Sequence, residues 1–167
     1  MNLTIRAGSI ADWPTIEQIY RAGIRTGEAT FNTEADVPDT AVAWFASKLD
    51  GLTFVAVDEE DRVVGWIALT AVSKRRVYAG VAEVSVYVAR DAWGQGVGRA
   101  LLEHEIVASE AAGIWTLQAT IFPTNAVSVR LHEKVGFRLV GRRERPAQLN
   151  GVWRDTVLLE RRSAVVG

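Results

Sequence analysis

A glycine-rich stretch between a predicted strand and a predicted helix is the most informative chemical feature of the sequence. Residues 91–98 read Asp-Ala-Trp-Gly-Gln-Gly-Val-Gly, which places glycines at positions 94, 96 and 98. Glycine lets the backbone approach a ligand closely, and the first N–H groups of a helix have no acceptor within the helix. These groups and the helix dipole together favour an anion such as a pyrophosphate. The stretch therefore predicts a nucleotide-phosphate site.

Two common phosphate-binding patterns do not match this stretch. A P-loop places lysine and then serine or threonine after its last glycine, whereas this chain has Arg99-Ala100 there. The dinucleotide fingerprint has a different final gap and lies in the first strand-helix unit of its domain, whereas this stretch lies in the middle of the chain. The pattern therefore disfavours both ATP hydrolysis and dinucleotide binding.

The strand predicted before the glycine-rich stretch carries polar groups on one face. Within Val81–Val88 the residues at 84, 86 and 88 are valines, which share one face of a strand. Glu83, Ser85 and Tyr87 alternate with them and share the other face. This second face can therefore present chemistry a few residues before the predicted phosphate site.

The hydrophobic pattern predicts the elements that position these residues. Apolar residues recur at helical spacing near 13–24, 42–49, 101–111 and 127–135. Alternating or branched apolar runs predict strands near 3–7, 53–57, 63–69, 81–88, 115–121, 137–143 and 152–160. The runs at 53–57 and 63–69 are separated by a turn-like segment and predict an antiparallel hairpin. The whole order predicts an α/β (α+β) fold with a mixed sheet.

Size, composition and charge limit the class of protein. The 167 residues are 49% hydrophobic and 23% charged, which fits a single compact domain over residues 1–167. A net charge of -1 lacks the basic field that holds nucleic acid or anionic membranes, so we expect neither partner. No apolar run has the length of a signal peptide or a membrane span.

The absence of cysteine excludes a disulfide framework, a cysteine nucleophile and thiolate metal ligands. It also favours the reducing cytoplasm as the location of the protein. His104 and His132 are the only histidines, and their spacing does not indicate a metal cluster. We therefore expect no metal.

Two motifs in the C-terminal half carry a family resemblance. Gln95–Ala100 resembles the Gln/Arg-x-x-Gly-x-Gly/Ala pyrophosphate loop of the GCN5-related N-acetyltransferase (GNAT) superfamily. Asn125 followed by Leu131–Phe137 resembles the asparagine and the Glu-Lys-x-Gly-Phe segment of the same superfamily. The resemblance implies one N-acetyltransferase domain, a mainly antiparallel central sheet flanked by helices, and acetyl-CoA as the cosubstrate.

A finer resemblance points to the branch of phosphinothricin and methionine sulfoximine acetyltransferases. The segments that carry it are Thr30-Phe31, Lys74-Arg75, Tyr78, residues 82–88 and residues 151–155. One departure is the loop from Arg76 to Val81, which has apolar residues where relatives often have aspartate and tryptophan. The resemblance implies a small amino-acid-like substrate and a homodimer.

The resemblance assigns two catalytic residues. An amine must lose its proton before it attacks a thioester, and Glu83 can accept that proton directly or through water. Alternatively, Glu83 merely faces solvent on a half-exposed strand. His132 occupies a position where many relatives have a tyrosine that protonates the leaving thiolate, and imidazole titrates near neutral pH. The alternative for His132 is a partly buried histidine bonded to a neighbour.

The resemblance also implies two sets of binding residues. The cofactor set pairs the backbone of Val86–Val88 with the pantetheine arm, and an N–H group there could hold the developing oxyanion. The remaining expected cofactor residues are Gly94, Gln95, Gly96, Val97, Gly98, Arg99 and Asn125. The expected substrate residues are Phe31, Lys74, Arg75, Glu83 and Trp153. The basic loop would bind anionic groups, although an isolated basic run is usually a solvated loop.

Three functions remain open at this point. The favoured one is acetyl transfer to the amino group of phosphinothricin, methionine sulfoximine or a related analogue. The second is acetyl transfer to a protein N-terminus, a polyamine or an antibiotic, which would require an open groove or an acidic pocket. The third is a non-catalytic module that binds acyl-CoA without a working base.

Overall fold

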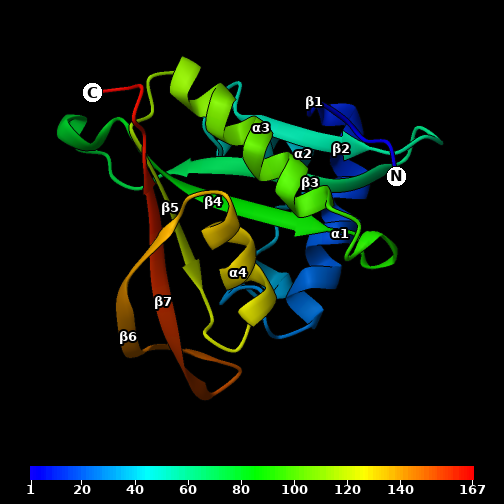
Figure 1. The fold of residues 1–167 in the computed structure, drawn as a ribbon. Coiled ribbons are helices and arrows are strands. Elements are labelled where there is room, and N and C mark those ends of the chain that lie inside the picture. Colours follow the sequence, from blue (N-terminus) through cyan, green and yellow to red (C-terminus); the bar gives the residue numbers. More distant parts are fainter.

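The computed structural model describes residues 1–167 and contains one mixed sheet with helices on both faces (Figure 1). The strands are β1 (Thr4–Ala7), β2 (Thr53–Val57), β3 (Val63–Ala71), β4 (Val81–Val88), β5 (Thr116–Ile121), β6 (Arg138–Leu149) and β7 (Val152–Arg162). The helices are α1 (Trp13–Arg25), α2 (Ala41–Ala46), α3 (Val97–Ala111) and α4 (Ala126–Lys134). Short 3-10 turns, η1 to η4, cover Ile10–Asp12, Glu34–Asp36, Arg76–Tyr78 and Arg90–Ala92.

The sheet has the strand order β1-β2-β3-β4-β5-β7-β6. All neighbouring strands are antiparallel except β4 and β5, which are parallel. The predicted hairpin of β2 and β3 is present, with Phe54 opposite Ile67 and Val55 opposite Trp66. The mixed, mainly antiparallel sheet expected from the sequence is confirmed.

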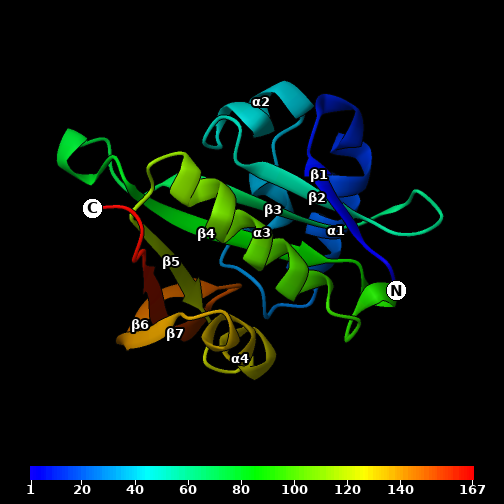
Figure 2. The same ribbon diagram turned by 45° about the horizontal axis from the view of Figure 1, so that its top comes forward.

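Each face of the sheet is covered by its own hydrophobic core. Phe54 and Ile67 point into the core under α3, whereas their neighbours Val55 and Trp66 point into the core under α1 and α2. Strand residues alternate between the faces, so both sets of side chains are buried. Figure 2 shows α3 on one side of the sheet and α1 and α2 on the other.

The two central strands separate after a short pairing. β4 and β5 pair only from Val81↔Thr116 to Glu83↔Gln118. Beyond this point β5 pairs only with β7, as far as Ile121↔Val157. The second half of β4 keeps β3 as its only neighbour. The sheet therefore opens beside Glu83.

Helix α2 and strand β6 are among the elements that differ in length from the sequence prediction. Helix α2 begins after Thr40, whose Oγ1 accepts a hydrogen bond from Ala43 N at 3.1 Å. It ends at Ala46, short of the predicted residue 49, because the chain then turns to the sheet and Leu49 N donates to Leu69 O at 2.8 Å. Strand β6 runs to Leu149, beyond the predicted residue 143, and contains register shifts where it pairs with β7.

Helix α3 buries a carboxyl group in the core. The side chain of Glu105 has 0% exposure, and neither carboxyl oxygen has a hydrogen-bond partner in the protein. Burial raises the pKa of Glu105 to about 8. An unpaired buried carboxylate is costly, so the neutral acid is favoured in the folded state up to that pH.

This buried group makes stability depend on pH. The folded state holds the Glu105 proton up to about pH 8, whereas the unfolded chain releases it near its ordinary value of 4.5. The free energy of unfolding therefore falls between those pH values as the pH rises.

We expect Glu105→Gln to stabilise the protein at pH 8.5 by roughly 3 kcal/mol, and by much less at pH 5. Urea unfolding at the two pH values measures this difference. The matched control is Glu103→Gln on the same helix, at an exposed ion pair with Arg99, which should change stability by less than about 1 kcal/mol. An equal effect of Glu105→Gln at both pH values would contradict the expectation.

Candidate active site

The N-terminus of α3 presents a run of unpaired backbone amides. Gly94 and Gly96 have φ values of +73° and +84°, in the left-handed region that favours glycine, and Gly96 directly precedes the helix. The N–H groups of residues 94–99 donate no hydrogen bond within the chain, and the first helical bond runs from Ala100 N to Gly96 O at 3.0 Å. Free donors and the positive end of the helix dipole are the features that suit a loop to a phosphate group.

The other residues of this loop support its shape. A Cβ atom at Gly98 would lie 2.9 Å from Leu131 Cδ2, so the third glycine permits close packing of α3 on α4. Gln95 Nε2 donates to Asp91 O at 2.9 Å, and Arg99 pairs with Glu103 at 2.7 Å. These side chains contact the protein itself, whereas the backbone amides stay free to donate to a ligand.

The second half of β4 has an unpaired edge next to this loop. β3 pairs with one edge of the strand up to Val88, whereas β5 pairs with the other only through Glu83. An extended ligand can therefore lie along residues 84–88 as an additional strand. The carbonyl of Val88 is already used, because Trp93 Nε1 donates to it at 2.9 Å.

A cleft of about 530 Å³ lies between the separated strands. Its walls come from β3, β4 and β5, from the loop between α1 and α2, from the residues that follow α2, and from α4. The volume is in the range of small-molecule sites. Phe31 lines the cleft and packs edge-on against Phe122, with 4.9 Å between the ring centroids.

The carboxylate of Glu83 is held across the opening between the strands. Thr120 Oγ1 on β5 donates to Glu83 Oε1 at 2.8 Å. Glu83 is half-buried, lines the cleft and lies opposite Thr70 of β3 in the sheet. Its other carboxylate oxygen has no protein partner, so it can accept a proton from a substrate amine.

His132 is a buried, neutral group in the wall of the cleft. Its side chain is 2% exposed, and Nδ1 lies 2.7 Å from Ser128 O. A carbonyl only accepts, so Nδ1 carries the proton and Nε2, which has no partner, is an acceptor. Burial lowers the pKa of His132 below its ordinary value. In this state Nε2 has no proton to give to a leaving thiolate.

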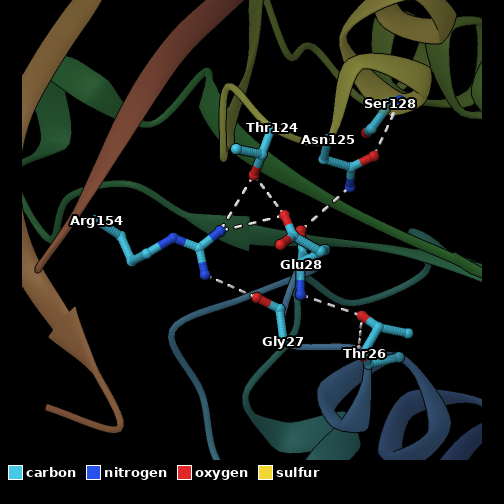
Figure 3. A network of polar contacts seen from close by, with 8 residues as sticks. Thr26, Gly27, Glu28, Thr124, Asn125, Ser128 and Arg154 are labelled. Atoms are coloured by element: carbon cyan, nitrogen blue, oxygen red, sulfur yellow. Dashed lines mark hydrogen bonds and ion pairs between the residues drawn. The ribbon is translucent and has the colours of Figure 1, made fainter. Parts of the chain in front are cut away.

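Arg154 on β7 holds the loop between α1 and α2 against the cleft wall (Figure 3). Its Nη1 donates to Gly27 O at 2.9 Å, and its Nη2 donates to Glu28 Oε2 at 3.1 Å. The same Nη2 donates to Thr124 Oγ1 at 3.2 Å, and the Thr124 hydroxyl donates to Glu28. The guanidinium lies over Phe122, 4.2 Å from the ring centroid. We call these residues the Arg154 clasp.

Asn125 joins the clasp to the start of α4. Its Oδ1 accepts a hydrogen bond from Ser128 N at 3.3 Å and so caps the helix. Its Nδ2 donates to Glu28 O at 3.2 Å (Figure 3). Both ends of the side-chain amide therefore bind the protein, and the predicted contact of Asn125 with the cofactor stays a prediction.

The comparison with known proteins identifies the family. The model of the Acetyltransferase (GNAT) family matches residues 13–137, which include the glycine-rich loop, β4 and α4. The chain belongs to the GNAT family of acetyltransferases. Like the family, it is an acetyl-CoA-dependent N-acetyltransferase.

The similar GNAT proteins include enzymes named for small amino-acid-like substrates. A phosphinothricin N-acetyltransferase of Alcaligenes faecalis is 36% identical over 95% of this chain and 81% of its own length. An L-methionine sulfoximine/L-methionine sulfone acetyltransferase of Pseudomonas paraeruginosa is 31% identical over 96% and 94%. The structure of a phosphinothricin acetyltransferase from Sinorhizobium meliloti in complex with AcCoA is 30% identical, covers 97% and 89%, and has a TM-score of 0.86.

The GNAT site fits acetyl-CoA as the cosubstrate. The unpaired amides of residues 94–99 suit the pyrophosphate, and the open edge of β4 suits the extended pantetheine arm. The ring of Tyr87 is stacked on Trp66 with 4.7 Å between centroids. The chain has no group of three or more histidine, aspartate or glutamate side chains that could hold a metal ion. None of the helices has the length and apolar character needed to cross a bilayer.

The GNAT site does not include every predicted substrate residue. Lys74 and Arg75 lie in the exposed loop between β3 and β4, which extends away from the sheet in Figure 1, and neither lines the cleft. Arg75 instead lies over the ring of Tyr78, 5.5 Å from its centroid. Trp153 is 54% exposed and borders a separate shallow hollow. None of these three residues is among those that line the cleft, so their contact with the substrate stays a prediction.

Sequence reasoning missed three residues at or next to the cleft. Thr120 and Lys48 line it, and Arg154 closes one side of it. A threonine on a strand and a lysine after a helix are common surface residues, so their types gave no signal. Arg154 lay inside a segment that resembled the family, but nothing in the sequence indicated its partners.

The Arg154 clasp should stabilise the GNAT fold measurably. Arg154→Ala removes three hydrogen bonds from a guanidinium that is 20% exposed, so we expect a loss of about 1–3 kcal/mol in urea unfolding. The control is Arg142→Ala, which breaks a pair with Asp155 on the same hairpin at a side chain that is 61% exposed. That change should cost less than about 1 kcal/mol. Equal losses of stability in the two variants would show that the clasp contributes no more than an exposed ion pair.

The protonation of His132 can be measured directly. We expect nitrogen-detected NMR of the protein to show the tautomer with the proton on Nδ1 at pH 7, because Ser128 O accepts that proton. We also expect a titration midpoint below 6.5, because burial disfavours the charged imidazolium. A midpoint at or above 6.5, or a proton on Nε2, would be inconsistent with this geometry.

Proposed function

We propose that this enzyme transfers an acetyl group from acetyl-CoA to the amino group of a small amino-acid-like substrate, with Glu83 as the general base. The substrates in question are phosphinothricin, methionine sulfoximine or a related analogue, as in the relatives described above. The observation that carries the proposal is the Glu83 carboxylate, which lines the cleft where β4 and β5 separate.

In this proposal the free oxygen of Glu83 takes the proton from the substrate ammonium, directly or through water. The hydrogen bond from Thr120 fixes the carboxylate so that little reorganisation is needed. Acetyl-CoA supplies the acetyl group as a thioester: the C–N bond forms to the neutral amine, the C–S bond breaks, and the proton lost by the attacking nitrogen balances the proton taken up by the leaving thiolate. The N–H groups of the open β4 edge are available to the negative charge that develops on the carbonyl oxygen.

Phe31 belongs in the substrate pocket of this proposal. It is half-buried, lines the cleft, and stands on the loop that the Arg154 clasp holds in place. Its edge-on contact with Phe122 fixes the ring, so it can form an apolar wall for the substrate side chain. His132 contributes an acceptor at Nε2 rather than an acid in this arrangement.

The alternative substrates fit the cleft less well. A polyamine site would need several acidic groups, whereas Glu83 is the only carboxylate that lines this cleft. A peptide substrate would need an open groove, whereas the clasped loop closes one side of this one. A non-catalytic module that only binds acyl-CoA would not require a carboxylate held in place by Thr120 inside the cleft. We also propose a homodimer, from the family resemblance, and a cytoplasmic location, from the absence of cysteine.

The proposal predicts the effect of Glu83→Gln. Glutamine keeps the hydrogen bond from Thr120 but accepts no proton, so kcat/KM for the amine should fall by roughly 10²–10⁴-fold. CoA binding should stay unchanged, because the amides of residues 94–99 are untouched. Thiol release is measured with phosphinothricin, methionine sulfoximine, methionine sulfone, spermidine, an aminoglycoside and N-terminal peptides.

The outcomes separate the open functions. Turnover confined to the amino-acid analogues supports the proposal. Turnover only with peptides, spermidine or the aminoglycoside would keep the acetyl transfer but assign a different class of substrate. If no substrate is acetylated although the protein binds CoA, the non-catalytic acyl-CoA-binding module is favoured. Unchanged turnover of Glu83→Gln would remove this residue from the mechanism. Glu133→Gln, at an exposed position on α4, is the control for a charge removed elsewhere.

A further inference from the structure

The cleft contains one positive and one negative side chain. Among the 22 residues that line it, Lys48 and Glu83 are the only ones with a lysine, arginine, aspartate or glutamate side chain. His132 also lines it and is neutral, because burial lowers its pKa. The cleft therefore offers one site for a cation and one for an anion.

The backbone brings these two residues to the same cleft. Lys48 follows α2, and the next residue is fixed to β3 by the hydrogen bond from Leu49 N to Leu69 O at 2.8 Å. Thr70, the neighbour of Leu69, lies opposite Glu83 in the pairing of β3 with β4. The lysine and the glutamate thus approach the cleft from two sides of β3.

Lys48 has no counter-charge in the protein. Its side chain is half-buried, and it forms no ion pair and donates no hydrogen bond to the chain. The ammonium lies over the ring of Trp44, 5.0 Å from its centroid. Burial lowers the pKa of Lys48, which reflects the cost of removing this charge from water.

Arginines elsewhere around the cleft are paired. Arg154 is paired with Glu28 and Arg25 with Glu34, so their charges are satisfied inside the protein. A partly desolvated ammonium without a carboxylate partner gains most from an anion that enters with the ligand. Lys48 is in that position, and the exposed Lys74 and Arg75 are outside the cleft.

We propose that Lys48 binds the α-carboxylate of the substrate while Glu83 receives its α-amine, so that the cleft selects free amino acids. This inference rests on the proposed function and names the substrate class more narrowly. A peptide N-terminus has a neutral amide in place of the carboxylate, and a polyamine has a second cation there. Both would leave the Lys48 ammonium without a partner, and the polyamine would also repel it.

The test compares a carboxylate with its neutral amide. The ligands are L-methionine sulfone and L-methionine sulfone carboxamide, which differ only at the group assigned to Lys48. Binding to the CoA-loaded protein is measured by calorimetry, and acetylation is measured separately by thiol release. The variants are Lys48→Gln, Lys48→Arg, Lys74→Gln and the control Lys134→Gln, whose side chain is exposed at the end of α4.

We expect Lys48→Gln to weaken binding of the acid by roughly 10- to 100-fold, since it removes a charge-assisted bond. Binding of the carboxamide should change by less than about threefold, because an amide does not need the charge. Lys48→Arg should restore part of the affinity for the acid. CoA affinity and the thermal midpoint should stay close to wild type, and Lys134→Gln should change nothing.

Three results with the variants would overturn the inference. The first is an equal loss for acid and carboxamide in Lys48→Gln, which indicates a structural role. The second is an unchanged preference for the acid in Lys48→Gln. The third is a loss specific to the acid in Lys74→Gln alone. Acid-selective binding through Lys48 without acetylation by wild type would retain the carboxylate site and reject the proposed catalysis. Wild type that binds neither ligand would reject both.

Discussion

The separation of β4 from β5 after Glu83 and Gln118 is the constraint on which the site depends. Up to that pair the strands share a ladder, and beyond it β5 keeps only β7 while β4 keeps only β3. A strand inside a sheet normally has both edges paired, so this separation leaves backbone donors and acceptors of β4 open to a ligand. It also creates the space in which Thr120 can reach across to Glu83. The cleft, the placement of Glu83 within it and the open edge thus share one structural origin.

The glycine-rich loop completes the site by local conformation. Left-handed backbone at Gly94 and Gly96 turns the chain so that the amides of residues 94–99 remain unpaired at the start of α3. Gly98 serves a different purpose, since it lets α3 approach Leu131 of α4. The loop therefore leaves its amides open to a ligand, and it also packs against the helix that carries His132.

Charge is distributed unevenly around the cleft. Most ionic groups near it are already satisfied, as in the Arg154 clasp, which closes one side through the α1–α2 loop (Figure 3). Lys48 and Glu83 remain as the two opposite charges in the lining. A partly buried, low-dielectric setting strengthens the attraction of such groups for a ligand of matching charge. An α-amino acid likewise carries one cation and one anion, which is the charge content that the proposed selection uses.

The sequence by itself determined the order of the elements, the glycine-rich loop before α3 and the strand that carries Glu83. These features depend on local chemistry: glycine permits left-handed backbone, and alternation assigns the two faces of a strand. Only the tertiary structure decided that Lys48 enters the cleft and that Lys74 and Arg75 stay outside it. It also decided that Glu28 and Arg154 meet across 126 positions of the chain, and that burial leaves His132 neutral. Contacts between residues so far apart depend on how the sheet and loops pack, and that packing leaves no periodic signal in the sequence.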